Sequence, residues 1–187
     1  VLVETEELFS YRALTLLREL HRELYDSVPF VEDVTSLIDV EFTRGTEYGM
    51  QIEQIVPVVI PESAEGLMQI RDKALSKENF RKRLISSDGT QTWIMIKLLP
   101  FPEDWQEEYE EYPQLMVGAA VDRIIGKQTY AELHPRGTGM PYLAHEKRAY
   151  FEKESGRIMG LAILMAVLVL ALALRSLKGV LIPLLTA

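Results

Sequence analysis

The chain has 187 residues, enough for one domain of ordinary size with an attached segment. Its 28 acidic and 20 basic residues give a net charge of −8, which excludes a broad positive surface and argues against nucleic acid as a partner. The absence of cysteine excludes disulfides and thiolate metal sites.

The N-terminal part of the chain predicts a strand, a helix and a second strand. Residues 1–6 are expected to be the end of the first strand. Apolar residues recur at spacings of three and four from Tyr11 to Tyr25, which predicts a helix. Ser10 is its expected N-cap, and Pro29 ends it. Alternation then predicts a strand across Val31 to Phe42.

A further strand and helix are expected to form an insertion before the next strand of the domain. Met50 to Ile60 is an extended segment, and a helix is predicted from about Ser63 through Leu75. The turn signal Asp88-Gly89 introduces a predicted strand from Thr92 to Leu99. We interpret its stretch from Trp93 to Ile96 as core, with the lining of an apolar substrate path as the alternative.

The stretch from Phe101 to Tyr112 reads FPEDWQEEYEEY and has no apolar period. We interpret it as a solvated loop or helix start. A bound cation is the alternative, although the spacing matches no calcium loop. Pro113 to Gly126 has a proline at the expected first position and a glycine at the expected end, and it predicts a helix. Tyr130 to His134 is predicted to be a last short strand.

Glycine and proline break the chain before its C-terminal helix. We interpret Gly137, Gly139 and Pro141 as a hinge. A helix is predicted from about Leu143, and it is expected to continue into the apolar segment.

Candidate sites for chemistry are sparse. The three histidines, His21, His134 and His145, are far apart in sequence and have no partner at ligand spacing. A zinc site built from them and carboxylates is the weaker alternative to ordinary surface or core histidines. We therefore expect no metal site, no cofactor and no catalytic residue, and we do not expect an enzyme.

The strongest pattern is the run from Ile158 to Leu174, which contains no charged, amide or hydroxyl side chain. All 28 acidic residues precede it. As a helix it would rise about 26 Å at ~1.5 Å per residue, close to the ~30 Å hydrocarbon core of a bilayer. Arg157 and Arg175 flank the run, and these two residues and Lys178 are expected to be its interface anchors. The run predicts a transmembrane helix, and a buried core helix is the alternative.

A short basic turn follows the run. Arg175 and Lys178 are its only charged residues, and residues 180–185 become apolar again. The positive-inside rule predicts that this turn is cytoplasmic and that residues 1–156 are extracytoplasmic. We therefore expect a multi-pass membrane protein. Because the chain opens with Val1, its true N-terminus is expected to be missing.

The predicted order defines an α+β fold. Without the inserted strand and helix it is a ferredoxin-like βαββαβ unit, followed by a transmembrane α-helix. We expect a domain over residues 1–152, a helix entering and spanning the membrane over 153–175, and a cytoplasmic turn with the start of the next span over 176–187.

The whole chain resembles the extracytoplasmic region between the first two spans of resistance-nodulation-division (RND) superfamily exporters, in the mycobacterial large membrane protein (MMPL) and Patched-like branch. Short segments spread along the chain carry the resemblance. They are Leu8-Phe9-Ser10, Val31 to Leu37 (VEDVTSL), Leu84 to Thr90 (LISSDGT), Thr138 to Leu143 (TGMPYL) and Leu174 to Leu184 (LRSLKGVLIPL).

The resemblance implies a location in the bacterial cytoplasmic (inner) membrane. It also implies a porter subdomain and export driven by proton flow through carboxylates of a later span. No Asp or Glu follows Arg157, so those carboxylates are expected outside this chain. The implied partners are the lipid bilayer, a lipid-like or amphiphilic substrate and the remaining domains of the same protein, with a homo-oligomer left open. The alternatives are an extracytoplasmic ligand-sensing domain of a receptor and a protein-translocation accessory of the same superfamily.

Overall fold

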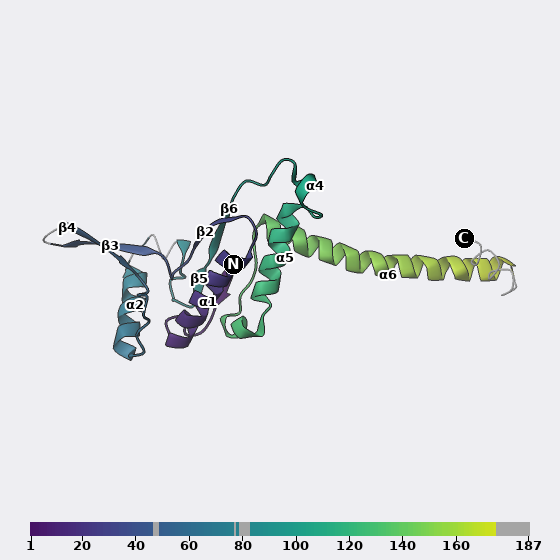
Figure 1. Ribbon diagram of the computed structural model, residues 1–187. Coiled ribbons are helices and arrows are strands. Elements are labelled where there is room, and N and C mark those ends of the chain that lie inside the picture. The colour runs from purple at the N-terminus through teal and green to yellow at the C-terminus, as the bar shows by residue number, and fades with distance from the viewer. Residues whose placement is uncertain (47–48, 77, 79–82, 175–187) are drawn as a thin grey trace. The chain divides into compact units, whose positions relative to one another are not determined.

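The computed structural model describes residues 1–46, 49–76, 78 and 83–174 (Figure 1). The chain divides into two compact units, Val1–His145 and Glu146–Ala187. The first unit mixes short strands with helices, which confirms the predicted α+β class. The second contains the greater part of one long helix.

The described elements follow one another as strand, helix, three strands, helix, two strands and four helices. They are β1 (Leu2–Glu4), α1 (Tyr11–Ser27), β2 (Val31–Thr35), β3 (Glu41–Thr46), β4 (Gly49–Gln54), α2 (Ala64–Ser76), β5 (Gln91–Trp93), β6 (Met95–Leu98), α4 (Trp105–Glu108), α5 (Pro113–Ile125), the 3₁₀ helix η1 (Gln128–Leu133) and α6 (Met140–Leu174).

The strands form three antiparallel pairs, β1 with β5, β2 with β6, and β3 with β4. β5 and β6 are separated only by Ile94, so this segment pairs with β1 through its first half and with β2 through its second. On its other side β1 forms a single bridge, between Leu2 and Arg136. The pairing order is therefore Arg136, β1, β5 followed by β6, and β2.

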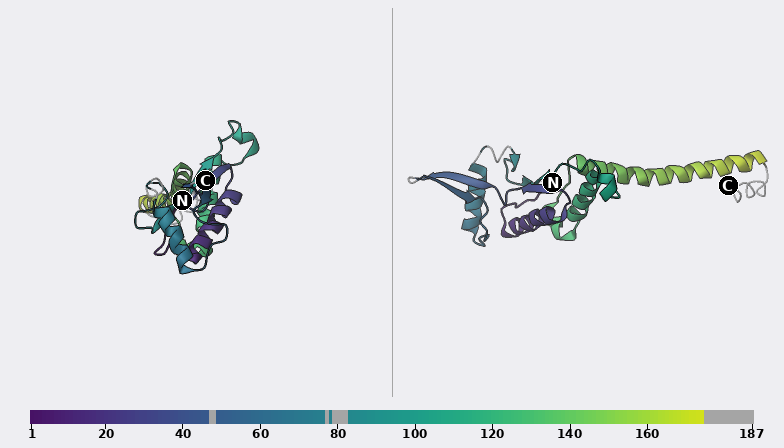
Figure 2. Two further views of the ribbon diagram at one scale, coloured as in Figure 1. Left: turned by 90° about the vertical axis from the view of Figure 1, so that its left-hand side faces the viewer. Right: turned by 45° about the horizontal axis from the view of Figure 1, so that its top comes forward.

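Helix α1 forms where its local signals predict it. The Ser10 side chain accepts a hydrogen bond from the Ala13 N–H at 3.1 Å and so caps the first turn. One face of the helix is buried and supplies much of the core, and α1 contacts α5 and η1 (Figure 2). The buried residues of this face are Ala13, Leu14, Leu16, Leu17, Leu20 and Leu24.

The strand predicted across Val31 to Phe42 is wrong in its second half. β2 ends at Thr35, and a turn separates it from β3. The Ser36 N–H donates to Asp39 Oδ1 at 2.6 Å, and the Ile38 N–H donates to Ser36 Oγ at 3.1 Å. Short polar side chains that bond to nearby backbone compete with strand pairing, and here they end the strand.

The strand predicted at Tyr130 to His134 is also wrong. These residues belong to η1, which ends at His134 in a left-handed conformation with φ 40°. The Tyr130 hydroxyl donates to Glu23 on α1 at 2.7 Å, and Lys127 pairs with the same carboxylate. Contacts with α1 therefore determine this segment. The ferredoxin-like order is not confirmed, because the expected last strand is reduced to the bridge at Arg136.

The burial of the Trp93–Ile96 segment alternates. Ile94 is fully buried, whereas Trp93 and Met95 are 38% and 45% exposed. The prediction that the Trp and Met side chains belong to the core is therefore wrong. Successive side chains of a strand point to opposite faces, and only the face that carries Ile94 is covered.

The acidic stretch between Phe101 and Tyr112 is mostly irregular and holds the four-residue helix α4, as predicted. Its aromatic rings form a chain of edge-to-face contacts. Phe101 contacts Phe30 at a centroid distance of 5.5 Å, and Trp105 contacts Tyr112 at 5.2 Å. These rings attach the stretch to the unit without a regular apolar period.

Thr92 in β5 gives a first testable prediction. It is fully buried, and its hydroxyl has no hydrogen-bond partner among the described residues. Thr92→Val has nearly the same shape and removes the unpaired group, so we expect the free energy of unfolding to rise by about 1 kcal/mol in denaturant titrations.

Thr90→Val is the matched control for this prediction. The Thr90 hydroxyl donates to Asp88 at 2.9 Å, so the same exchange should lower stability there. If Thr92→Val also lowered the free energy of unfolding, the Thr92 hydroxyl would have a hydrogen-bond partner in the folded protein, and the prediction would be wrong.

Candidate functional site

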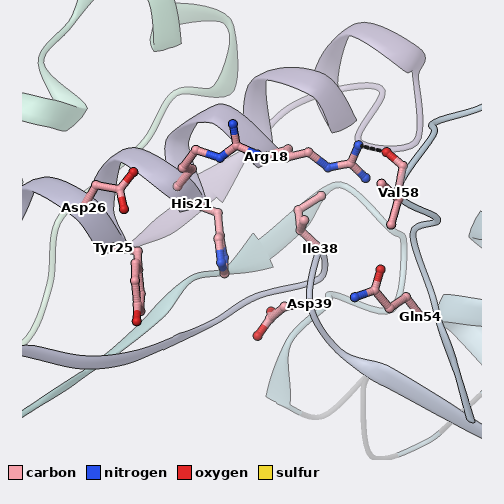
Figure 3. Close-up of a pocket in the computed structure, with 9 residues that line it drawn as sticks. Arg18, His21, Tyr25, Asp26, Ile38, Asp39, Gln54 and Val58 are labelled. Carbon is pink, nitrogen blue, oxygen red and sulfur yellow. Dashed lines mark hydrogen bonds between the residues drawn. The ribbon is translucent and has the colours of Figure 1, made fainter.

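A polar stripe runs along α1 beside its buried leucines. Arg18, His21, Arg22 and Tyr25 are spaced i, i+3, i+4 and i+7, so they lie on one face of the helix. This face lines a cleft of about 530 Å³ (Figure 3). The other lining residues are Asp26, Ile38, Asp39, Gln54 and Val58.

Arg18 fixes one wall of the cleft. Its guanidinium donates to the Val58 carbonyl at 2.5 Å (Figure 3). It also donates to the Pro57 carbonyl at 2.6 Å. Burial lowers the pKa of Arg18, and repulsion from Arg22 lowers it further. These bonds hold the segment after β4 against α1 and leave the Val58 side chain 78% exposed.

A hydrogen bond with Ser36 orients the imidazole ring of His21. The Nδ1 atom of His21 lies 2.9 Å from the Oγ of Ser36, which is fully buried and accepts the Ile38 N–H. Ser36 Oγ and His21 Nδ1 share one hydrogen bond, whose direction depends on the imidazole tautomer. Burial lowers the pKa of His21, although Asp39 and Asp33 oppose the effect. In the tautomer whose Nδ1 accepts the Ser36 hydroxyl proton, the neutral imidazole presents an Nε2–H donor to the cleft.

Ser36, His21 and Asp39 do not form a nucleophilic triad. Ser36 Oγ is fully buried, and Asp39 bonds the Ser36 backbone N–H. A nucleophile must reach its substrate, and its base must be oriented by the third group. These three residues instead fix the turn between β2 and β3 and the orientation of the imidazole.

The predicted hinge residues surround the start of α6 within the first unit. Gly139 has φ +97°, a conformation that favours glycine, and Pro141 lies in the first turn of α6, which begins at Met140 and not at Leu143. A Cβ on Gly137 would lie 2.3 Å from the Tyr142 ring. Gly137 is therefore a site of close packing, and its role as a hinge stays a prediction.

The first turns of α6 pack closely on α5. A Cβ on Gly118 of α5 would lie 2.2 Å from the Pro141 carbonyl oxygen. The Tyr142 hydroxyl donates to Asp122 at 3.1 Å, and His145 Nε2 lies 3.8 Å from the same carboxylate. The absence of a side chain at Gly118 permits this approach.

The three histidines lie in different parts of the unit: His21 in the cleft, His134 at the end of η1 and His145 near the start of α6. Within the described part of the chain, no group of three or more metal-ligating side chains gathers. The structure thus offers no support for the zinc alternative or for the cation alternative at the acidic stretch.

The second unit contains the predicted membrane segment. α6 continues to Leu174, and the predicted anchor Arg157 pairs with Glu154 at 2.9 Å. Among the described residues, no helix meets the length and apolarity that a membrane crossing requires. The predicted span from Ile158 to Leu174 is therefore not confirmed. Arg175 and Lys178 lie outside the described residues.

Sequence reasoning missed the polar stripe of α1. The leucine spacing located the helix, and the same spacing beside the leucines could have located Arg18, His21, Arg22 and Tyr25. The wall formed by Gln54 and Val58 could not have been found this way, because the end of β4 and the segment after it reach the cleft only in the folded structure.

The fold and site define an α+β unit with a polar cleft, joined to a long helix that ends in an apolar run. The chain matches the model of the MMPL family over residues 13–187. It belongs to this family of membrane transporters, within the RND superfamily. No curated protein and no solved structure matches the chain.

Proposed function

We propose that this chain is part of a proton-motive-force-driven exporter of lipid-like or amphiphilic molecules in the bacterial inner membrane. The observation that carries the proposal is the family match, which covers both the α+β unit and the apolar run after Arg157. In this proposal residues 1–156 are the extracytoplasmic, porter-like domain. Ile158 to Leu174 crosses the bilayer, with Arg157 and Arg175 at its two interfaces.

The pairing of the strands supports a porter-like domain. The order Arg136, β1, β5 with β6, and β2 is the one expected when a ferredoxin-like unit has lost most of its last strand. The hairpin of β3 and β4 together with α2 occupies the place of the predicted insertion. The sensor alternative has no comparable observation in its favour.

The proposed mechanism is alternating access. α6 is one helix from Met140 to Leu174, and its first turns are fixed to α5 by Gly118 and Asp122. A helix transmits tilt and rotation because each of its residues is hydrogen-bonded to the next turn. Protonation of carboxylates elsewhere in the transporter would tilt the spans, and α6 would pass that movement to the porter-like domain.

Cysteine accessibility tests the topology. Because the chain has no cysteine, single substitutions label without background. In intact cells we expect a membrane-impermeant maleimide to label Lys153→Cys strongly and Lys178→Cys only after permeabilisation. Ala166→Cys should resist labelling in both conditions, because it would lie in the hydrocarbon core.

The topology fails if Ala166→Cys labels in intact cells as readily as Lys153→Cys. Labelling of Lys178→Cys and not Lys153→Cys in intact cells would reverse the orientation. Denatured samples of every variant serve as the control for intrinsic thiol reactivity.

A further inference from the structure

The cleft beside α1 presents hydrogen-bond donors that the fold leaves unused. Arg22 and Tyr25 have no hydrogen-bond partner among the described residues, and neither has the Nε2 atom of His21. Unlike Arg18, these groups do not hold the fold together. A row of aligned donors that form no hydrogen bond within the fold is characteristic of a binding surface.

Among the described residues, neither arginine of the stripe forms an ion pair. The guanidinium of Arg18 bonds only neutral carbonyl oxygens, and repulsion from Arg22 acts on it. Like charges four residues apart on a helix are unfavourable unless an anion lies between or beside them. An anionic group in the cleft would relieve this repulsion and would meet the donors of His21 and Tyr25.

Two carboxylates also line the cleft. One oxygen of Asp39 accepts the Ser36 N–H, and Asp26 is exposed one turn beyond Arg22. They oppose an anion and keep the cleft from binding every small anion tightly. The charge of Asp39 also allows a directional test. Its neutralisation should raise the affinity of the cleft for an anion and lower its affinity for a cation.

Apolar surface adjoins the donors. Val58 lines the cleft and is 78% exposed, whereas Val59 lines a separate pocket. The Arg18 bonds to the carbonyls of residues 57 and 58 fix this surface in place. A ligand with an anionic head and an apolar chain could therefore satisfy both features at once.

We propose that the cleft binds the anionic head group of an amphiphile, through Arg22, His21 Nε2–H and the Tyr25 hydroxyl, with the apolar chain against Val58. Whether this ligand is exported rests on the proposed function, whereas its binding does not. A failure to bind the ligand would therefore contradict this inference and leave the proposed export function intact. A failure to export would contradict the proposed function and leave the binding site intact.

The test uses the whole chain in nanodiscs of phosphatidylcholine, with ¹⁵N-labelled histidine. The chain has three histidines, so the His21 ring signals can be assigned by substitution. The probes are hexyl phosphate, inorganic phosphate, hexanol and hexyltrimethylammonium. We expect hexyl phosphate to shift the His21 signals saturably and to bind at least fivefold more tightly than inorganic phosphate, since the chain adds apolar contact.

The variants separate the contributions. Arg22→Gln should lower the affinity for hexyl phosphate about tenfold, because a charge-assisted hydrogen bond is lost. Asp39→Asn keeps an oxygen for the Ser36 N–H and should tighten binding about threefold. Arg12→Gln is the matched control, since Arg12 lies on the same helix, is exposed and pairs with Glu132 away from the cleft. It should leave binding unchanged.

Three results would overturn the proposal. They are binding of hexanol or hexyltrimethylammonium as tight as that of hexyl phosphate, an unchanged affinity in Arg22→Gln, and equal affinities for inorganic phosphate and hexyl phosphate. The last would assign the site to free phosphate.

Discussion

Two glycines inserted after Glu152 are expected to abolish export while the α+β unit stays folded. Two residues turn the following helix by about 200° and lengthen it by about 3 Å. Glycine also weakens the helix at the insertion, by about 1 kcal/mol per residue relative to alanine. The insertion lies in α6, outside the unit Val1–His145. It should therefore change the transmission of movement and leave the fold of that unit intact.

The measurement is retention of the fluorescent amphiphile Nile red in cells that carry the complete transporter, with and without a protonophore. The control is the double substitution Glu152→Gly and Lys153→Gly, which adds flexibility without changing helix phase. A seven-residue alanine-rich insertion at the same place nearly restores the phase and should recover part of the export. Export at the parental level by the two-glycine variant would refute the coupling role of α6.

Gly118→Ala is expected to lower the free energy of unfolding by about 2 kcal/mol. Alanine normally stabilises a helix relative to glycine, by about 1 kcal/mol. At Gly118 the added Cβ would lie 2.2 Å from the Pro141 carbonyl oxygen and 2.7 Å from His145 Cβ. The first of these atoms is backbone, so no rotamer change relieves the clash, and the start of α6 must move away from α5.

Gly156→Ala is the matched control, since its Cβ would meet nothing within 4 Å. It should leave the melting temperature unchanged or raise it. Thermal unfolding followed by circular dichroism, together with the Tyr142 contact to Asp122 followed by NMR, would show whether α6 has moved. If Gly118→Ala raised the melting temperature as the control does, the close packing of α5 and α6 would be wrong.

Elements with strong local signals could be predicted from the sequence. The leucine spacing and Ser10 located α1, and Pro113 with Gly126 located α5, almost to the residue. Caps and helix-forming periodicity act within a few residues, so they need no knowledge of the rest of the chain. The family resemblance was likewise carried by the sequence, and the match over residues 13–187 confirmed it.

Elements whose form depends on distant partners could not be predicted in this way. Tyrosine is common in strands, and Tyr130 therefore favoured a strand prediction. In the structure its hydroxyl donates to Glu23 of α1, more than 100 residues earlier, and the segment forms a 3₁₀ helix. Trp93 and Met95 have strong strand propensity and form strands, yet which face of the strand is covered depends on the helices that pack there.

The sequence by itself determined the fold class, the positions of the main helices, the uneven distribution of charge and the family. The first three of these rest on composition or on local periodicity, and the family rests on the resemblance of short segments spread along the chain. Only the tertiary structure decided that Arg18, His21, Arg22 and Tyr25 face a cleft, because its other walls come from the turn after β2 and the segment after β4. The tertiary structure also explains the glycine at position 118. The first turn of α6 packs so closely there that a Cβ would clash with it.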